Sequence, residues 1–144
     1  TFFPNRAVRA TESAVKESAE HIVHTMGLTH RMHTPASVLS CGELRLLEVA
    51  LALAAKPEIL MLDEPAAGLN SQEARQFGEI LKTLRGTLVQ SILIVEHNMS
   101  LVMGVSDRVV VMHFGEKLIE GTPAQVQADS RVVEAYLGGG GKKA

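Results

Sequence analysis

The chain has 144 residues, of which 46% are hydrophobic, a composition that supports one folded domain and excludes intrinsic disorder. A formal net charge of −2 excludes a strongly basic protein built to bind polyanions, and the 3% aromatic content argues against a base-stacking surface, so we expect no nucleic-acid partner. A single cysteine, Cys41, excludes a disulfide within the chain, and the longest uncharged apolar run, 49–55, is too short to span a bilayer, so we expect a cytoplasmic protein.

The first half of the chain contains two predicted helices. Apolar residues at helical spacing, Val15, Ile22 and Met26 among them, predict a helix over residues 10–28. Residues 30–38 form a polar connector. Strong helix formers with apolar residues around most of the circumference predict a buried helix over residues 43–55.

The second half alternates strands and helices. The segment EILMLDEP, residues 58–65, is almost continuously apolar, as buried parallel strands are, and SILIVEHN, residues 91–98, resembles it. Between them lies an amphipathic helix over residues 71–86, with Ser71 as its expected cap. This alternation predicts an α/β fold with a mainly parallel sheet.

The remaining elements are shorter. We expect a short helix over 99–106, a hairpin that turns at Phe114 and Gly115, and helical pieces over 122–138. The terminal residues 139–144 are predicted to be a flexible tail.

Asp63 and Glu64 stand at the end of the first predicted strand, followed by Pro65. A strand that simply stops at a polar turn would explain any single DEP sequence. In a parallel sheet, however, ligands bind at the carboxyl ends of the strands. An aspartate there can hold Mg²⁺, and the adjacent glutamate can orient or deprotonate an attacking water.

The segment LSCGEL, residues 39–44, opens the second predicted helix. Ser40 and Glu43 have the spacing of a capping box, which is sufficient to explain so short a match. Gly42 is unusual in a first helical turn, and its merit is to allow a close approach to the backbone. Free amides, the helix dipole and a hydroxyl suit a phosphate, and this role is compatible with capping.

His97 directly follows the second predicted strand, where it could reach a γ-phosphate, although a lone histidine is more often structural. The other histidines have no cysteine or carboxylate partners at metal-ligand spacing, so we expect surface residues and no zinc site. They are His21, His24, His30, His33 and His113.

Taken in order, LSCGEL, ILMLDEP, AGLN and ILIVEHNM resemble the second half of an ATP-binding-cassette ATPase. The resemblance covers residues 10–138. The phrases DEPAAGLN, VEHNMSLVMGVSDRVVVM and GEKLIEGTPAQV are most similar to the ATPase subunits of branched-chain amino acid importers.

The resemblance implies a role for each matching residue. Leu39, Ser40, Gly42 and Glu43 would form the signature motif, which contacts ATP held by the opposite subunit. Asp63 would serve Mg²⁺, Glu64 would polarise the attacking water, and His97 would touch the γ-phosphate. Asn70 would belong to a loop that crosses the dimer interface, at a position where many relatives carry Asp.

The resemblance also implies a division of the chain. Residues 1–56 would be part of the helical subdomain with the signature motif, and residues 57–138 the C-terminal part of a P-loop NTPase (RecA-like) core. Leu44 and Leu51 depart from the polar residue and the arginine usual at these positions. No G-x-x-x-x-G-K-[ST] occurs in the 144 residues, so we expect a fragment of a longer ATPase that is inactive alone.

Two functions follow from the resemblance. The first is an ATP-hydrolysing subunit of an importer, which binds ATP and Mg²⁺ together with a second, identical or related cassette. This pair would drive permease subunits from the inner face of the membrane. The alternative is a catalytically incompetent module that offers its signature face to a complete cassette. ATPases of DNA repair or translation fit less well, because neither long heptad repeats nor paired cassettes are present.

Overall fold

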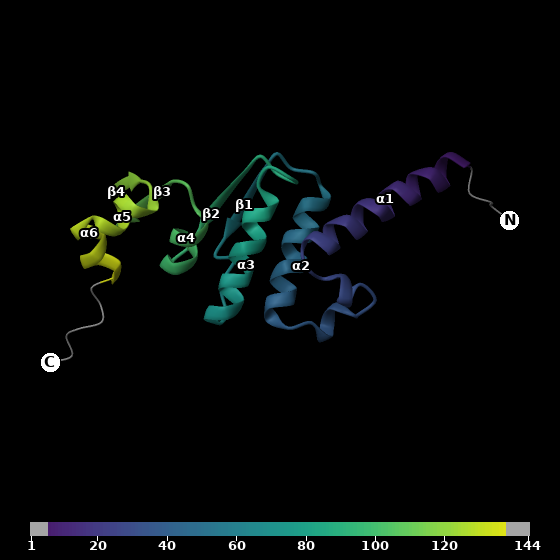
Figure 1. Ribbon diagram of the computed structural model, residues 1–144, viewed down its shortest axis with the longest axis horizontal. Helices are drawn as coiled ribbons and strands as arrows, with labels where there is room; N and C mark the ends of the chain where they lie inside the picture. The colour runs from purple at the N-terminus through teal and green to yellow at the C-terminus, as the bar shows by residue number, and fades with distance from the viewer. Residues whose placement is uncertain (1–5, 138–144) are drawn as a thin grey trace. The chain divides into compact units, whose positions relative to one another are not determined.

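The computed structural model describes residues 6–137, and the predicted tail at 139–144 lies outside them (Figure 1). The chain consists of two compact units, with the boundary between Val95 and Glu96. Each unit combines helices with a pair of strands, which confirms the predicted α/β class.

The first unit begins with two α-helices joined by a connector that contains two short 3₁₀ turns. Helix α1 spans Arg6–Thr25, the connector contains the short turns η1 (Thr29–Arg31) and η2 (Ala36–Val38), and α2 spans Cys41–Ala54. Helix α2 buries Val49, Ala50 and Leu53, whereas Leu51 on its other side is 67% exposed. The expectation of a helix buried all round is therefore wrong for the described chain, because its neighbours pack against one side only.

Helix α3 spans Ser71–Leu84, so Ser71 is its first helical residue and the N-cap precedes it. The Asn70 side chain accepts hydrogen bonds from the amides of Gln72 and Glu73, so Asn70 is the N-cap and the expectation for Ser71 is wrong. Both residues are good caps, but the extended backbone at Asn70, with φ −74° and ψ 169°, aims its amide oxygen at the helix.

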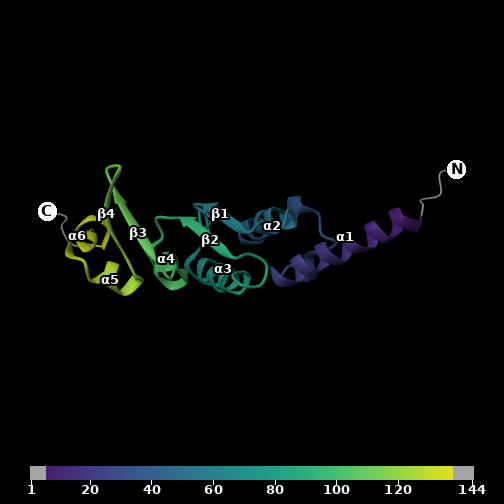
Figure 2. The ribbon, with the colours of Figure 1, turned by 90° about the horizontal axis from the view of Figure 1, so that it is seen from above.

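Strands β1 (Ile59–Asp63) and β2 (Ser91–Val95) pair in parallel, as predicted, with Ile59 opposite Ser91 and Asp63 opposite Val95. Helix α3 runs along one face of this pair (Figures 1 and 2). Burial alternates along β1, where Leu60 is 3% exposed and Met61 is 72% exposed. The strands are thus buried on one face only in the described chain, in contrast to the expectation from their apolar sequences.

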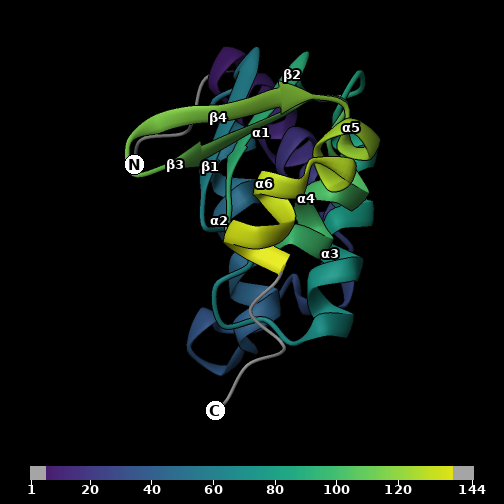
Figure 3. The same cartoon turned by 90° about the vertical axis from the view of Figure 1, so that its left-hand side faces the viewer.

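The second unit contains helix α4 (Met99–Val105) and a hairpin of β3 (Val109–His113) and β4 (Glu116–Gly121) (Figure 3). The two turn residues, Phe114 at φ 48° and Gly115 at φ 81°, are both left-handed. This is the turn that matches the twist of antiparallel strands, and it confirms the predicted hairpin.

Three helical pieces follow the hairpin, namely α5 (Pro123–Ala128), α6 (Ser130–Val132) and the π-helical turn η3 (Val133–Leu137). The core of this unit is built from four buried valines. They are Val109, Val111, Val126 and Val132. Alternate β3 residues thus pack with one residue from each of α5 and α6, as the period of two in a strand requires.

Candidate functional site

Strand β1 delivers Asp63 and Glu64 to its carboxyl end, as predicted. Glu64 has a left-handed backbone with φ 45°, which is rare for a residue other than glycine. Its amide donates to the Val95 carbonyl oxygen over 2.8 Å, and its own carbonyl oxygen accepts from the Ala67 amide over 3.0 Å. The turn is therefore fixed to the end of β2, and Glu64 is held in a conformation that costs about 1–2 kcal/mol.

Asp63 and Glu64 place carboxylate oxygens at this turn, which is the ligand type that hard cations such as Mg²⁺ bind. Within residues 6–137, no group of three or more His, Cys, Asp or Glu side chains could hold a metal ion. Mg²⁺ is usually bound through one or two carboxylates, with phosphate oxygens and water completing the shell. The exposed carboxylate of Asp63 fits this arrangement as a single protein ligand.

Residues 39–43, called the signature segment below, lie at the start of α2, and both hydrogen bonds of the predicted capping box are present. The Ser40 Oγ accepts from the Glu43 amide over 3.2 Å, and Glu43 Oε2 accepts from the Ser40 amide over 2.8 Å. These two bonds fix the first turn of α2 and confirm the predicted capping role of Ser40 and Glu43.

Glu43 has further partners that the sequence did not indicate. Its Oε1 accepts from Arg31 Nε over 2.7 Å and lies 3.4 Å from His30 Nε2. Bonding to the Ser40 amide, and then to Arg31, lowers the pKa of Glu43 from its ordinary 4.5 to about 2. Glu43 is therefore a carboxylate at neutral pH, held between a helix start and a cation.

The start of α3 lies against the signature segment. A Cβ added to Gly42 would lie 3.5 Å from Glu73 Oε1, which is an ordinary contact, so packing within the chain does not demand glycine there. A Cβ added to Gly68 would lie 3.3 Å from Cys41 Sγ, and Gly68 has φ +82°. The structure thus brings the 39–43 and 67–70 segments together.

Asn70 and Glu73 form a second capping box. Glu73 Oε2 accepts from the Asn70 amide over 2.9 Å, while Asn70 Oδ1 accepts from the Glu73 amide over 3.0 Å. The sequence analysis missed Glu73, although its spacing from Asn70 is the usual signal of such a box. Asn70 therefore has a structural role that is sufficient to explain it.

His97 lies at the start of the second unit, two residues beyond β2. Glu96 Oε2 accepts from the amides of His97 and Asn98, both over 3.0 Å, and Asn98 caps α4. The His97 side chain is exposed. The other five histidines are exposed as well, as expected.

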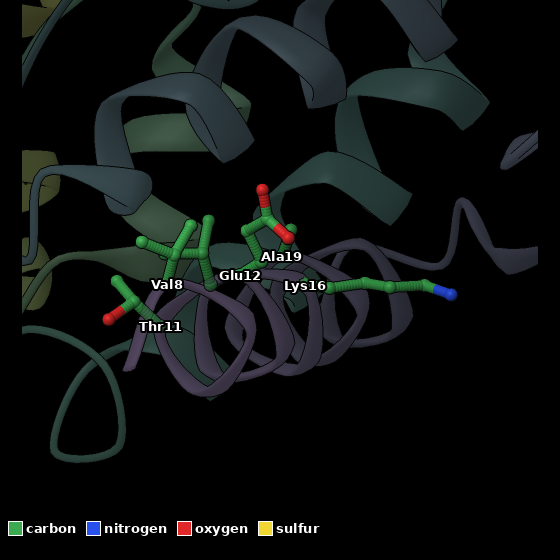
Figure 4. A pocket seen from close by; sticks show the side chains of 6 residues that line it. Val8, Thr11, Glu12, Lys16 and Ala19 are labelled. Atoms are coloured by element: carbon green, nitrogen blue, oxygen red, sulfur yellow. The ribbon is translucent and has the colours of Figure 1, made fainter. Parts of the chain in front are cut away.

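An open groove of about 530 Å³ lies elsewhere, on the amino-terminal part of α1 (Figure 4). All of its lining residues come from that helix, and none is a candidate site residue. They are Val8, Thr11, Glu12, Val15, Lys16 and Ala19. Across residues 6–137, the helices lack the combination of length and hydropathy that a membrane span requires.

The chain is similar to curated ATP-binding proteins of transporters. The chain is 42% identical over 130 residues to the high-affinity branched-chain amino acid transport ATP-binding protein LivG of Escherichia coli, covering 90% of this chain and 51% of LivG. It is 40% identical over 136 residues to BraF of Pseudomonas aeruginosa, covering 94% of this chain and 53% of BraF. The chain is therefore similar to ATP-binding-cassette transporter ATPases over about half of their length.

Family models and solved structures agree with this similarity. Residues 1–67 match the ABC transporter model, and residues 116–142 match that of the branched-chain amino acid ATP-binding cassette transporter. The ADP conformation of the cassette MJ1267 superposes with a TM-score of 0.77 at 30% identity, covering 87% of this chain and 50% of MJ1267. CbiO1 of Clostridium perfringens, part of the transporter complex cbiONQ, also superposes with a TM-score of 0.77. The two sequences are 28% identical, and the match covers 85% of this chain and 49% of CbiO1.

These matches confirm the predicted resemblance and the P-loop NTPase class of this chain. The chain spans about half the length of the curated relatives it matches. The roles of the individual site residues stay predictions.

Proposed function

We propose that this cassette chain contributes the signature segment, the metal-binding aspartate and the catalytic glutamate of an ATPase that powers import of branched-chain amino acids. The observation that carries the proposal is the acidic pair at the end of β1, where Glu64 is held left-handed by its bond to Val95. The transport named for LivG and BraF supports the substrate class.

The two carboxylates have separate roles in this proposal. Asp63 binds Mg²⁺ and thereby the nucleotide, and Glu64 accepts a proton from the attacking water as general base. When bound, Mg²⁺ neutralises negative charge on the phosphates. His97 donates a hydrogen bond to the γ-phosphate, a contact that strengthens as charge develops there.

The signature segment acts on a second nucleotide. The Ser40 hydroxyl and the amides at the start of α2 receive the γ-phosphate of ATP held by an opposing cassette, which is an identical chain or a related one. Leu39 and Gly42 shape this segment, and Asn70 lies at the same interface. Residues 1–56 form part of the helical subdomain, and residues 57–138 part of the ATPase core.

The assembled cassettes lie at the inner face of the membrane, bound to permease subunits.

A specific observation favours a second function for the chain by itself, namely that of a binding module for a complete cassette. None of its 144 residues form the G-x-x-x-x-G-K-[ST] loop whose amides and lysine hold the phosphates. The chain alone would then present a signature segment without binding its own nucleotide tightly.

An association experiment tests the proposal. Immobilised chain is exposed to complete E. coli LivG with Mg²⁺ and either a non-hydrolysable ATP analogue or ADP. We expect association that requires the ATP analogue, and we expect calorimetry of the chain alone with Mg-ATP to detect weak binding at most. Association that is indifferent to the nucleotide, or low-micromolar binding of ATP by the chain alone, would contradict the proposal.

A further inference from the structure

The connector before α2 carries an arginine that is held firmly in place. The η1 turn, Thr29–Arg31, follows Met26 and Leu28, which are 0% and 4% exposed. The Leu28 amide donates to the Val23 carbonyl oxygen over 2.9 Å, and the Arg31 amide donates to the Leu28 carbonyl oxygen over 2.8 Å. The backbone of Arg31 is thereby anchored to the end of α1.

From this anchor the Arg31 side chain reaches the signature segment, twelve residues along the chain. Its Nε donates to Glu43 Oε1 over 2.7 Å, and the Glu43 side chain is only 17% exposed. His30, whose Nε2 lies 3.4 Å from the same oxygen, is the other basic side chain at this carboxylate. Glu43 Oε2 accepts from the Ser40 amide over 2.8 Å, so each carboxylate oxygen has a donor.

This arrangement answers an electrostatic difficulty in the proposed site. A carboxylate in the first turn of a helix offsets the same partial positive charge that would attract a phosphate. Glu43 is ionised at neutral pH, so it would repel a nucleotide approaching the start of α2. A guanidinium bonded to Glu43 cancels that charge locally, because it stays protonated at any physiological pH.

The same contact holds the Ser40 side chain in place. The Ser40 Oγ accepts from the Glu43 amide, and the Ser40 side chain also bonds to the Glu43 carboxylate, which helps to lower the pKa of that group. Ser40 and Glu43 therefore fix each other at the start of α2. Fixing the Glu43 side chain keeps both halves of the box formed.

We infer that Arg31 is a positioning residue for the nucleotide of the opposing cassette, because it holds Glu43 in the capping box and offsets its charge. Arg31 does this without touching the nucleotide itself. The inference rests on the proposed function, in which the start of α2 receives a γ-phosphate.

The test is a double-variant cycle in the association assay with complete LivG and the ATP analogue. Arg31→Ala is expected to raise the analogue concentration for half-maximal association about threefold to tenfold, the effect of one partly exposed charge near another. The maximal association at saturating analogue should change little. Glu43→Gln keeps a capping-box side chain and removes the charge, so the double variant should recover most of the loss.

Controls separate positioning from folding and from the proposed function. Lys82→Ala, which removes an equal charge from the Glu79–Lys82 pair toward the end of α3, is expected to leave the half-maximal concentration unchanged. Arg31→Lys should recover part of the effect. A purely structural role would lower the melting temperature and the maximal association together, and this result would overturn the inference.

Two further outcomes are distinct. If the unaltered chain associates in a nucleotide-dependent manner and Arg31→Ala matches it, the inference fails while the proposed function stands. If the unaltered chain shows no nucleotide-dependent association, the proposed function itself fails.

Discussion

Glu64 has a backbone conformation that its side chain disfavours. The fold maintains this left-handed turn through two hydrogen bonds, to Val95 and from Ala67. Strain of this kind persists where the surrounding structure over-determines it, and it concentrates at functional sites. A residue chosen for stability alone at this position would be glycine.

Glu64→Gly is therefore expected to stabilise the chain. Relief of the left-handed strain should raise the free energy of unfolding by about 1 kcal/mol relative to Glu64→Ala, which keeps the strain and also lacks the carboxylate. Chemical denaturation of the two variants measures the difference. Equal stabilities would show that the turn stores no strain at Glu64.

The lowered pKa of Glu43 predicts how the stability of the fold depends on pH. Because its pKa in the folded chain, about 2, lies below the ordinary 4.5, ionised Glu43 stabilises the fold above pH 4.5. This contribution is lost as the pH falls from 4.5 toward 2. Stability curves of the unaltered chain and Glu43→Gln should therefore converge across that window, and curves that stay parallel would contradict the bonding described for Glu43.

Features that depend on nearby residues could be predicted from the sequence, whereas contacts between distant residues could not. Asp63, Glu64 and the Ser40–Glu43 box were predictable because each depends on neighbours within a few residues. The Arg31–Glu43 bond and the approach of Glu73 to Gly42 join residues that are distant in the chain. No periodicity or spacing encodes such contacts, because they arise only when helices pack.

At the scale of elements, the helix starts are defined by capping side chains. Helices α2, α3 and α5 each begin with a reciprocal capping box, built on Ser40, Asn70 and Thr122. The choice between adjacent candidates, such as Asn70 and Ser71, depends on backbone angles that the sequence does not specify. Helix positions were therefore predictable to within a few residues, and their caps less so.

Replacement of the α3 cap tests this assignment. Asn70→Ala is expected to lower the free energy of unfolding by about 1 kcal/mol, because two amides lose their acceptor. Asn70→Asp should retain stability, and Ser71→Ala serves as the matched control with little effect. Thermal or denaturant unfolding measures all three, and a larger loss in Ser71→Ala than in Asn70→Ala would reverse the assignment.

At the scale of the whole molecule, the β1–β2 pair presents an apolar face to solvent. Ile59 and Met61 on β1 are 60% and 72% exposed, and Leu93 and Val95 on β2 are 51% and 57% exposed. Parallel strands are ordinarily covered on both faces, which is why their apolar sequences predicted full burial. Contiguous apolar surface of this kind favours association or aggregation.

Polar substitution of this face should improve the behaviour of the chain in solution. Met61→Thr combined with Leu93→Thr keeps strand-compatible side chains and should reduce binding of a hydrophobic dye and aggregation on heating. Leu60→Thr, on the covered face, should instead destabilise the chain by about 2 kcal/mol or more. Equal dye binding by the double variant and the unaltered chain would show that this face is not exposed in solution.

The central claim is that β1 ends at a hydrolytic site with two carboxylates in different roles. Its most direct measurement is phosphate release by a chimera that joins this chain to the part of E. coli LivG that it does not match. Glu64→Gln should reduce release about 100-fold or more while Mg-ATP still binds, since only the proton acceptor is lost. Asp63→Asn should weaken Mg-ATP binding itself, and a Glu64→Gln chimera that retained most of its phosphate release would contradict the account.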